Sequence, residues 1–105
     1  MSENACTDWN AWIDLMPGVE PTLYVTSKCE FPTTGYEVTL TREEPQGANP
    51  RDLLLRLEIK EPTGPVSEVI TEVEARYEES VGGEDFDTVS ILPDGPTGIE
   101  VQITK

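Results

Sequence analysis

The stretch from Leu23 to Arg42 constrains the fold more than any other part of the chain. Apolar and polar residues alternate in it twice, on either side of the segment Pro32-Thr33-Thr34-Gly35. Before this segment the odd positions hold Leu23, Val25, Cys29 and Phe31, and after it the even positions hold Tyr36, Val38 and Leu40. A period of two indicates β-strands that turn one face to a core and the other to water. The stretch therefore predicts strands over residues 23–31 and 36–42, joined by a turn.

The same alternation recurs in shorter runs along the chain. Further strands are predicted over residues 9–15, 53–60, 67–80, 86–92 and 99–104. Prolines and glycines separate these runs, as turn residues do in proteins made of short strands. For residues 9–15 a short helix remains an alternative, because Trp9, Trp12 and Ile13 also have helical spacing.

Short strands at this spacing, without a convincing helix, are typical of an all-β protein. We expect an antiparallel immunoglobulin-like β-sandwich of six or seven strands. The chain has 105 residues, so residues 1–105 should form a single domain, with residues 1–8 flexible. The strongest alternation predicts that one face of the 53–60 strand lies in the core. That face carries Leu53, Leu55, Leu57 and Ile59. Its expected neighbours in the core are Val25, Val38, Leu40, Val101 and Ile103.

The charge of the chain is strongly negative. It has 21 Asp and Glu residues, 7 Lys and Arg residues and no His, for a net charge of -14. Such a surface repels nucleic-acid phosphates and anionic lipid headgroups, so neither nucleic acid nor membrane is expected as a partner. Acidity of this kind serves solubility, attracts a basic protein partner, or holds a cation.

Two features of the sequence bear on its location. No apolar run approaches the roughly 20 residues needed to span a bilayer. The first residues show no basic region followed by an apolar stretch, so a signal peptide is not predicted. A cytoplasmic location is therefore expected, or a secreted or periplasmic one if the chain has been trimmed.

The sequence offers little to catalysis. Without His, the usual base for activating a nucleophile is missing. Cys29 would need nearby positive charge to act as a thiolate, but its neighbours are mainly apolar or acidic. Cys6 and Cys29 also lack the number and spacing of a zinc site, while a disulfide between them stays an open alternative. We expect neither enzymatic activity nor a cofactor.

An acidic segment near the glycine pair is a weak candidate for a cation. Glu84, Asp85 and Asp87 supply the oxygen ligands that calcium prefers, but without the spacing of a calcium-binding loop. A solvated acidic turn is the favoured interpretation, so no metal site is predicted.

Phe31-Pro32-Thr33-Thr34-Gly35-Tyr36 resembles the first inhibitory loop of the chagasin family, immunoglobulin-like inhibitors of papain-type cysteine proteases. The resemblance implies that Thr33, Thr34 and Gly35 enter a protease cleft and that Tyr36 begins the next strand. Val81-Gly82-Gly83 is similar to the glycine-rich second loop of the family. The third loop, Arg-Pro-Trp, has no counterpart, and Phe31 stands where the family has Asn.

Two functional hypotheses follow. The first is a non-catalytic domain that binds a protein or ligand through loops at one end of the sandwich. The alternative is a cysteine protease inhibitor of chagasin type. Both assign binding to Pro32, Thr33, Thr34, Gly35, Tyr36, Gly82 and Gly83.

Overall fold

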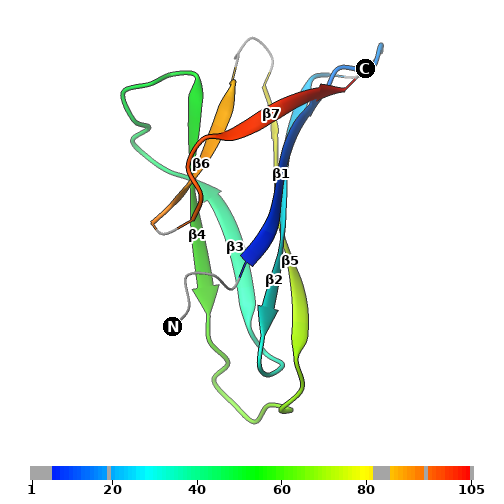
Figure 1. The fold of residues 1–105 in the computed structure, drawn as a ribbon, viewed down its shortest axis with the longest axis vertical. Coiled ribbons are helices and arrows are strands. Elements are labelled where there is room, and N and C mark those ends of the chain that lie inside the picture. The colour runs from blue at the N-terminus through cyan, green and yellow to red at the C-terminus, as the bar shows by residue number, and fades with distance from the viewer. Residues whose placement is uncertain (1–5, 19, 82–85, 94, 105) are drawn as a thin grey trace.

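The computed structural model describes residues 6–18, 20–81, 86–93 and 95–104, and these ranges contain strands but no helix (Figure 1). The seven strands are β1 (Cys6–Asp14), β2 (Thr22–Phe31), β3 (Glu37–Arg42), β4 (Asp52–Lys60), β5 (Thr71–Ser80), β6 (Thr88–Leu92) and β7 (Ile99–Thr104). The protein is therefore all-β, and residues 9–14 are strand instead of helix. β1 begins at Cys6, inside the segment that was expected to be flexible. Among the described residues, no helix is long and apolar enough to cross a membrane.

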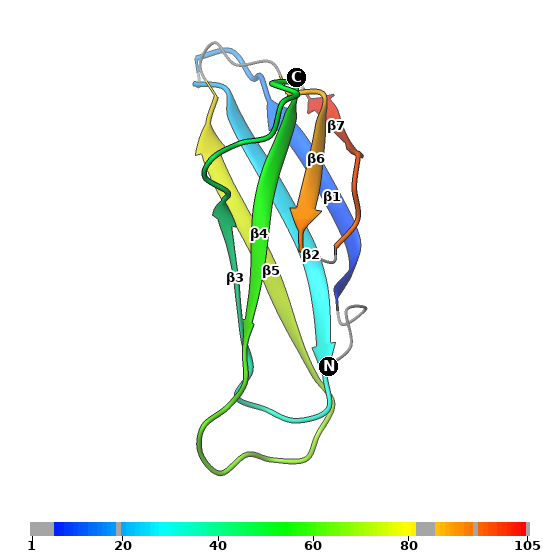
Figure 2. The ribbon, with the colours of Figure 1, turned by 90° about the vertical axis from the view of Figure 1, so that its left-hand side faces the viewer.

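The strands form one mostly closed sheet, whose two halves face each other as layers. β1, β2 and β5 make one layer, and β3, β4 and β6 make the other (Figure 2). β7 joins them, because it pairs with β6 at its start and with β1 further on. The strand order is β3-β4-β6-β7-β1-β2-β5, so β3 and β5 are the two end strands.

The sheet is mixed, and the expected wholly antiparallel arrangement is wrong. β1 pairs with β7 in parallel, and β4 pairs with β6 in parallel. The second pair has a simple cause in the path of the chain. After β4 the chain crosses to the other layer and returns along β5, so that Thr88 of β6 starts beside Asp52 of β4 and runs in the same direction.

Side chains from both layers fill the space between them. Along β2, buried residues alternate with less buried ones, as the period of two predicts. Leu53 and Leu55 of β4 and Leu23 and Val25 of β2 are fully buried. The predicted orientation of β4 is therefore confirmed at its centre.

The core is shorter than the alternation predicts. Leu57 and Ile59 are only partly buried, because β6 pairs with β4 no further than Arg56. Ile103 was expected in the core, but 53% of it is exposed. The reason is that β7 pairs with β6 only at Ile99 and Glu100, so its later residues extend past the start of β6.

Cys6 and Cys29 form a disulfide, which decides the question that the sequence left open. The two residues are directly opposite each other on β1 and β2. Cys29 is fully buried, as its parity predicted. The bond ties the start of β1 to the buried face of β2.

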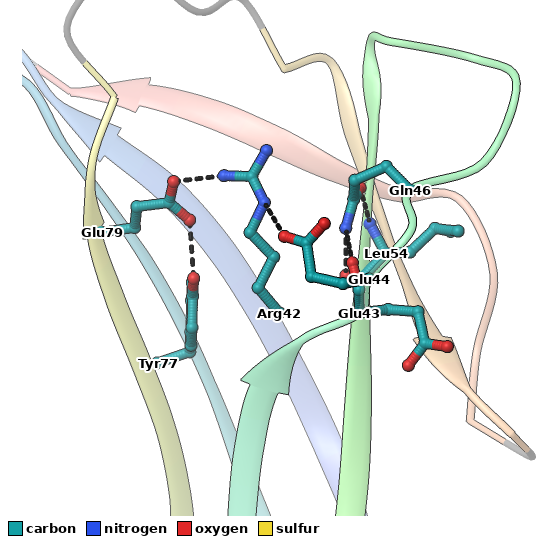
Figure 3. Close-up of polar contacts among 7 residues, drawn as sticks. All are labelled: Arg42, Glu43, Glu44, Gln46, Leu54, Tyr77 and Glu79. Atoms are coloured by element: carbon teal, nitrogen blue, oxygen red, sulfur yellow. Dashed lines mark hydrogen bonds and ion pairs between the residues drawn. The ribbon is translucent and has the colours of Figure 1, made fainter.

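The end strands β3 and β5 lie side by side and are joined by side chains (Figure 3). Arg42 at the end of β3 forms an ion pair with Glu79 of β5. The Tyr77 hydroxyl donates a hydrogen bond of 2.6 Å to the same carboxylate. Glu44 lies 3.6 Å from the Arg42 guanidinium. We call Arg42, Tyr77 and Glu79 the seam cluster, because they close the gap between the two end strands.

Candidate functional site

Two connections leave the sheet at the same end. The register pairs Phe31 with Thr71 and Glu37 with Lys60, so the β2–β3 loop and the β4–β5 loop emerge together. Both lie at the bottom of the molecule in Figures 1 and 2. We call residues 32–36 and 61–70 the paired-loop end. This end carries the predicted binding residues Pro32, Thr33, Thr34, Gly35 and Tyr36.

The two loops are bonded to each other. The Thr34 amide donates to the Ser67 carbonyl at 3.1 Å, and the Ser67 amide donates to the Thr34 hydroxyl at 3.0 Å. Gly35 has a φ of 94°, and a Cβ at this position would lie 2.7 Å from Cβ of Pro62. Only glycine accepts both this backbone conformation and this close approach. The paired-loop end is therefore a single braced surface.

Aromatic rings support the base of the shorter loop. Phe31 and Tyr36 stack with ring centroids 4.3 Å apart and planes 3° apart. Phe31 is buried, while Tyr36 is half-buried. Their stacking fixes the two ends of the Pro32–Gly35 turn, since each ring belongs to a residue that borders it.

The outer surface of this end is apolar. Val66, Val69 and Ile70 are exposed to 38%, 54% and 71%. Ile70 also lines a shallow hollow of about 260 Å³ together with Glu30, Phe31 and Pro32. Exposed apolar side chains that gather on one surface mark an interaction site more often than isolated ones do.

Carboxylates surround these apolar side chains. Residues 30–37 and 60–72 contain one cation, Lys60, and five anions, which gives this part of the chain a net charge of -4. The anions are Glu30, Glu37, Glu61, Glu68 and Glu72, and all are exposed. The surface thus combines an apolar centre with a negative rim.

The apolar part of this surface was not predicted from the sequence. A single strand over residues 67–80 would have turned Val69 inward, but β5 begins only at Thr71. Pro62, Gly64 and Pro65 were the available signal, because such residues commonly begin an irregular segment that continues for several positions.

The second predicted loop, with Gly82 and Gly83, falls outside the described residues, but the residues that border it are described. The Val81 amide donates to the Pro21 carbonyl at the start of β2, and the Phe86 ring lies 5.8 Å from the Arg42 guanidinium carbon. Both positions are at the opposite end of the strands from Pro32.

Among the suggested cation ligands, only Asp87 is described; Glu84 and Asp85 fall outside the described residues. Arg51 donates to both Asp87 carboxylate oxygens, at 2.5 and 2.9 Å. These hydrogen bonds hold the pKa of Asp87 below its ordinary value. In the described ranges, no three carboxylate or cysteine side chains lie together as metal ligands would.

Cys29, the nucleophile considered from the sequence, is not available as a thiolate in this structure. Cys29 is bonded to Cys6, and a disulfide sulfur does not titrate. Lys28 and Lys60, which could serve only as the base of a Ser–Lys pair, are both exposed.

Comparison with known protein families, with curated proteins and with solved structures gave no significant match.

Proposed function

We propose that this chain is a non-catalytic binding domain that recognises a basic, partly apolar protein segment through the paired-loop end. The observation that carries this proposal is the exposure of Val69 and Ile70 on loops that are bonded to each other. Apolar side chains held in this way present a surface whose burial would release ordered water and stabilise a complex.

The bracing between the loops also favours binding. The bonds between Thr34 and Ser67 keep the surface in one arrangement before a partner arrives. Less conformational entropy is then lost on association, so that more of the contact energy remains as affinity.

The acidic rim selects the charge of the partner. Five carboxylates and one lysine around the apolar centre attract Lys- and Arg-rich segments and repel acidic ones. Because these charges are exposed, salt weakens their attraction, and at an ionic strength of 0.1 M the attraction is largely screened beyond about 10 Å. Binding should therefore weaken as the salt concentration rises.

A peptide-display selection against the immobilised protein tests this proposal. The wild-type protein should enrich peptides that combine Lys or Arg with apolar residues. The double variant V69S/I70S should lose them. The matched control L15S/M16S removes exposed apolar side chains from the opposite end and should keep them. Equal enrichment by both double variants, or enrichment of acidic peptides, would contradict the proposal.

A second candidate function is inhibition of a papain-type cysteine protease. What supports it is the position of Thr33, Thr34 and Gly35 at an exposed, braced end of the molecule. This support is confined to the first loop, because Val81 and Phe86, which border the second predicted loop, lie at the opposite end of the strands. Steady-state inhibition of papain is the test, and full protease activity at micromolar protein would rule it out.

The finer fold assignment belongs to the same proposal. The layer of β1, β2 and β5 supports an immunoglobulin-like sandwich, in which the first, second and fifth strands also share a sheet. The parallel pairing of β4 with β6 is a departure from the usual antiparallel arrangement.

The disulfide supports an oxidising compartment over the cytoplasmic location expected from the sequence, because cytosolic thiols are normally kept reduced. Alkylation of the protein taken directly from its source cells is the test. If Cys6 and Cys29 resist alkylation, the oxidising location is supported. If both react as free thiols, it is contradicted.

A further inference from the structure

A separate hollow of about 420 Å³ lies in the layer of β1, β2 and β5. Its main lining residues are Asp8, Trp9, Asn10, Thr26, Lys28 and Glu74. Volumes of this order are typical of sites for small molecules. The hollow is distinct from the paired-loop end, since neither loop contributes to its lining.

The backbone beside this hollow is irregular in a defined way. The pairing of β1 with β2 shifts register between Thr7 and Asn10, and Asp8 has a φ of 57°. The Asn10 side-chain amide donates to the Asp8 carbonyl at 3.1 Å. Bulges of this type redirect side chains, and strained backbone of this type concentrates at functional sites. The disulfide at Cys6 anchors the strand two residues before the strained position.

The charges around the hollow do not neutralise one another. Lys28 and Glu74 are directly opposite each other on β2 and β5, where opposite charges commonly pair. Yet neither side chain forms an ion pair or hydrogen bond with another described residue, and the same holds for the Asp8 carboxylate. The hollow thus presents two carboxylates and one ammonium group that are open to a ligand.

We propose that this hollow binds the zwitterion of an α-amino acid with an apolar side chain. The ligand carboxylate pairs with Lys28, and the ligand ammonium pairs with Glu74 and Asp8. These are charge-assisted hydrogen bonds, which are stronger than neutral ones. The apolar side chain lies against Trp9, which is half-buried and lines the hollow.

Isothermal titration calorimetry with L-phenylalanine tests this proposal. The protein should bind one equivalent, whereas N-acetyl-L-phenylalanine lacks the ammonium group, L-phenylalanine amide lacks the carboxylate, and each should bind far more weakly. K28M and E74Q should each weaken binding by roughly tenfold or more, since each removes a charge-assisted hydrogen bond. D8N removes the carboxylate charge, and Asn tolerates the positive φ of this position as Asp does. It should weaken binding as well.

K60M and E58Q are the matched controls, because they make the same substitutions at exposed positions of β4. Both should bind L-phenylalanine as the wild type does. Three results would each overturn the proposal: no saturable binding of L-phenylalanine, equal binding of the N-acetyl derivative, or tighter binding of glucose. Urea unfolding of every variant separates a lost site from a lost fold.

Discussion

Arg42 of β3 and Glu79 of β5 form an ion pair between the two end strands of the sheet. Both side chains are mostly buried, with 27% and 21% of their surfaces exposed. Glu79 also accepts the hydrogen bond from Tyr77, so one carboxylate connects all three members of the seam cluster (Figure 3). These side chains therefore join β3 and β5, which are the two ends of the strand order and are not neighbours in the sheet.

The first prediction concerns this carboxylate. E79Q removes the charge that faces Arg42 and should lower the free energy of unfolding by about 1–3 kcal/mol, because a charge-assisted hydrogen bond between two mostly buried side chains is lost. Urea titration measures the effect. E78Q is the control, since Glu78 pairs with Arg76 on the exposed face and its loss should cost well under about 1 kcal/mol. Equal unfolding midpoints for the two variants would contradict the proposed role of the seam cluster.

The second prediction concerns Tyr77 in alkaline solution. Burial, followed by the hydrogen bond to Glu79, raises the pKa of the Tyr77 hydroxyl well above its ordinary value of 10.0. The native state therefore holds this proton more tightly than the unfolded chain does. Its contribution to stability is complete below about pH 10 and is lost as the pH rises beyond that value.

Tyrosinate absorbance measures this shift directly. The wild-type protein should show a tyrosine that ionises only far above pH 10, and Y77F should lack that late step. Stability should also decline more steeply above pH 10 in the wild type than in Y77F. A wild-type titration identical in shape to that of Y77F, apart from amplitude, would show that Tyr77 is not shifted.

The third prediction concerns the centre of the core. Leu55 is fully buried at the middle of β4. L55A loses apolar contact and leaves a cavity, which should cost roughly 2–5 kcal/mol. K60A, at an exposed position of the same strand, should cost well under about 1 kcal/mol. The comparison is again a pair of urea titrations, and a common midpoint would mean that this face of β4 is not in the core.

The fourth prediction concerns a polar cluster that joins β4 to β6. Thr88 and Ser90 donate hydrogen bonds to the Asp52 carboxylate, and the Gly98 amide donates to the Ser90 hydroxyl at 3.0 Å. D52A would leave the buried Ser90 hydroxyl without an acceptor, so we expect a loss of about 1–3 kcal/mol. E58A, which removes a carboxylate from an exposed position of the same strand, is the control. Hydrogen exchange should show the Gly98 amide less protected in D52A, and unchanged protection would disprove the coupling.

Much of the local structure follows from the sequence by itself. The alternation from Leu23 to Arg42 predicted β2 and β3 closely, and the run from Leu53 predicted β4 with its buried face. This works because strand side chains alternate between two faces, so the polarity of each residue reports which face it occupies. Pro32 to Gly35 could likewise be recognised as an exposed turn, since its residue types favour turn conformations.

Only the tertiary structure decided which elements meet. Polarity alternation carries no record of strand direction or partner, so the parallel pairs of β1 with β7 and β4 with β6 were not predictable from it. The exposure of Ile103 depends on where β6 begins, and the exposure of Ile70 depends on where β5 begins. The bonds between Thr34 and Ser67 and the disulfide between Cys6 and Cys29 join residues distant in the chain. Such contacts form only when the strands are paired in one particular register, which is a property of the folded chain as a whole.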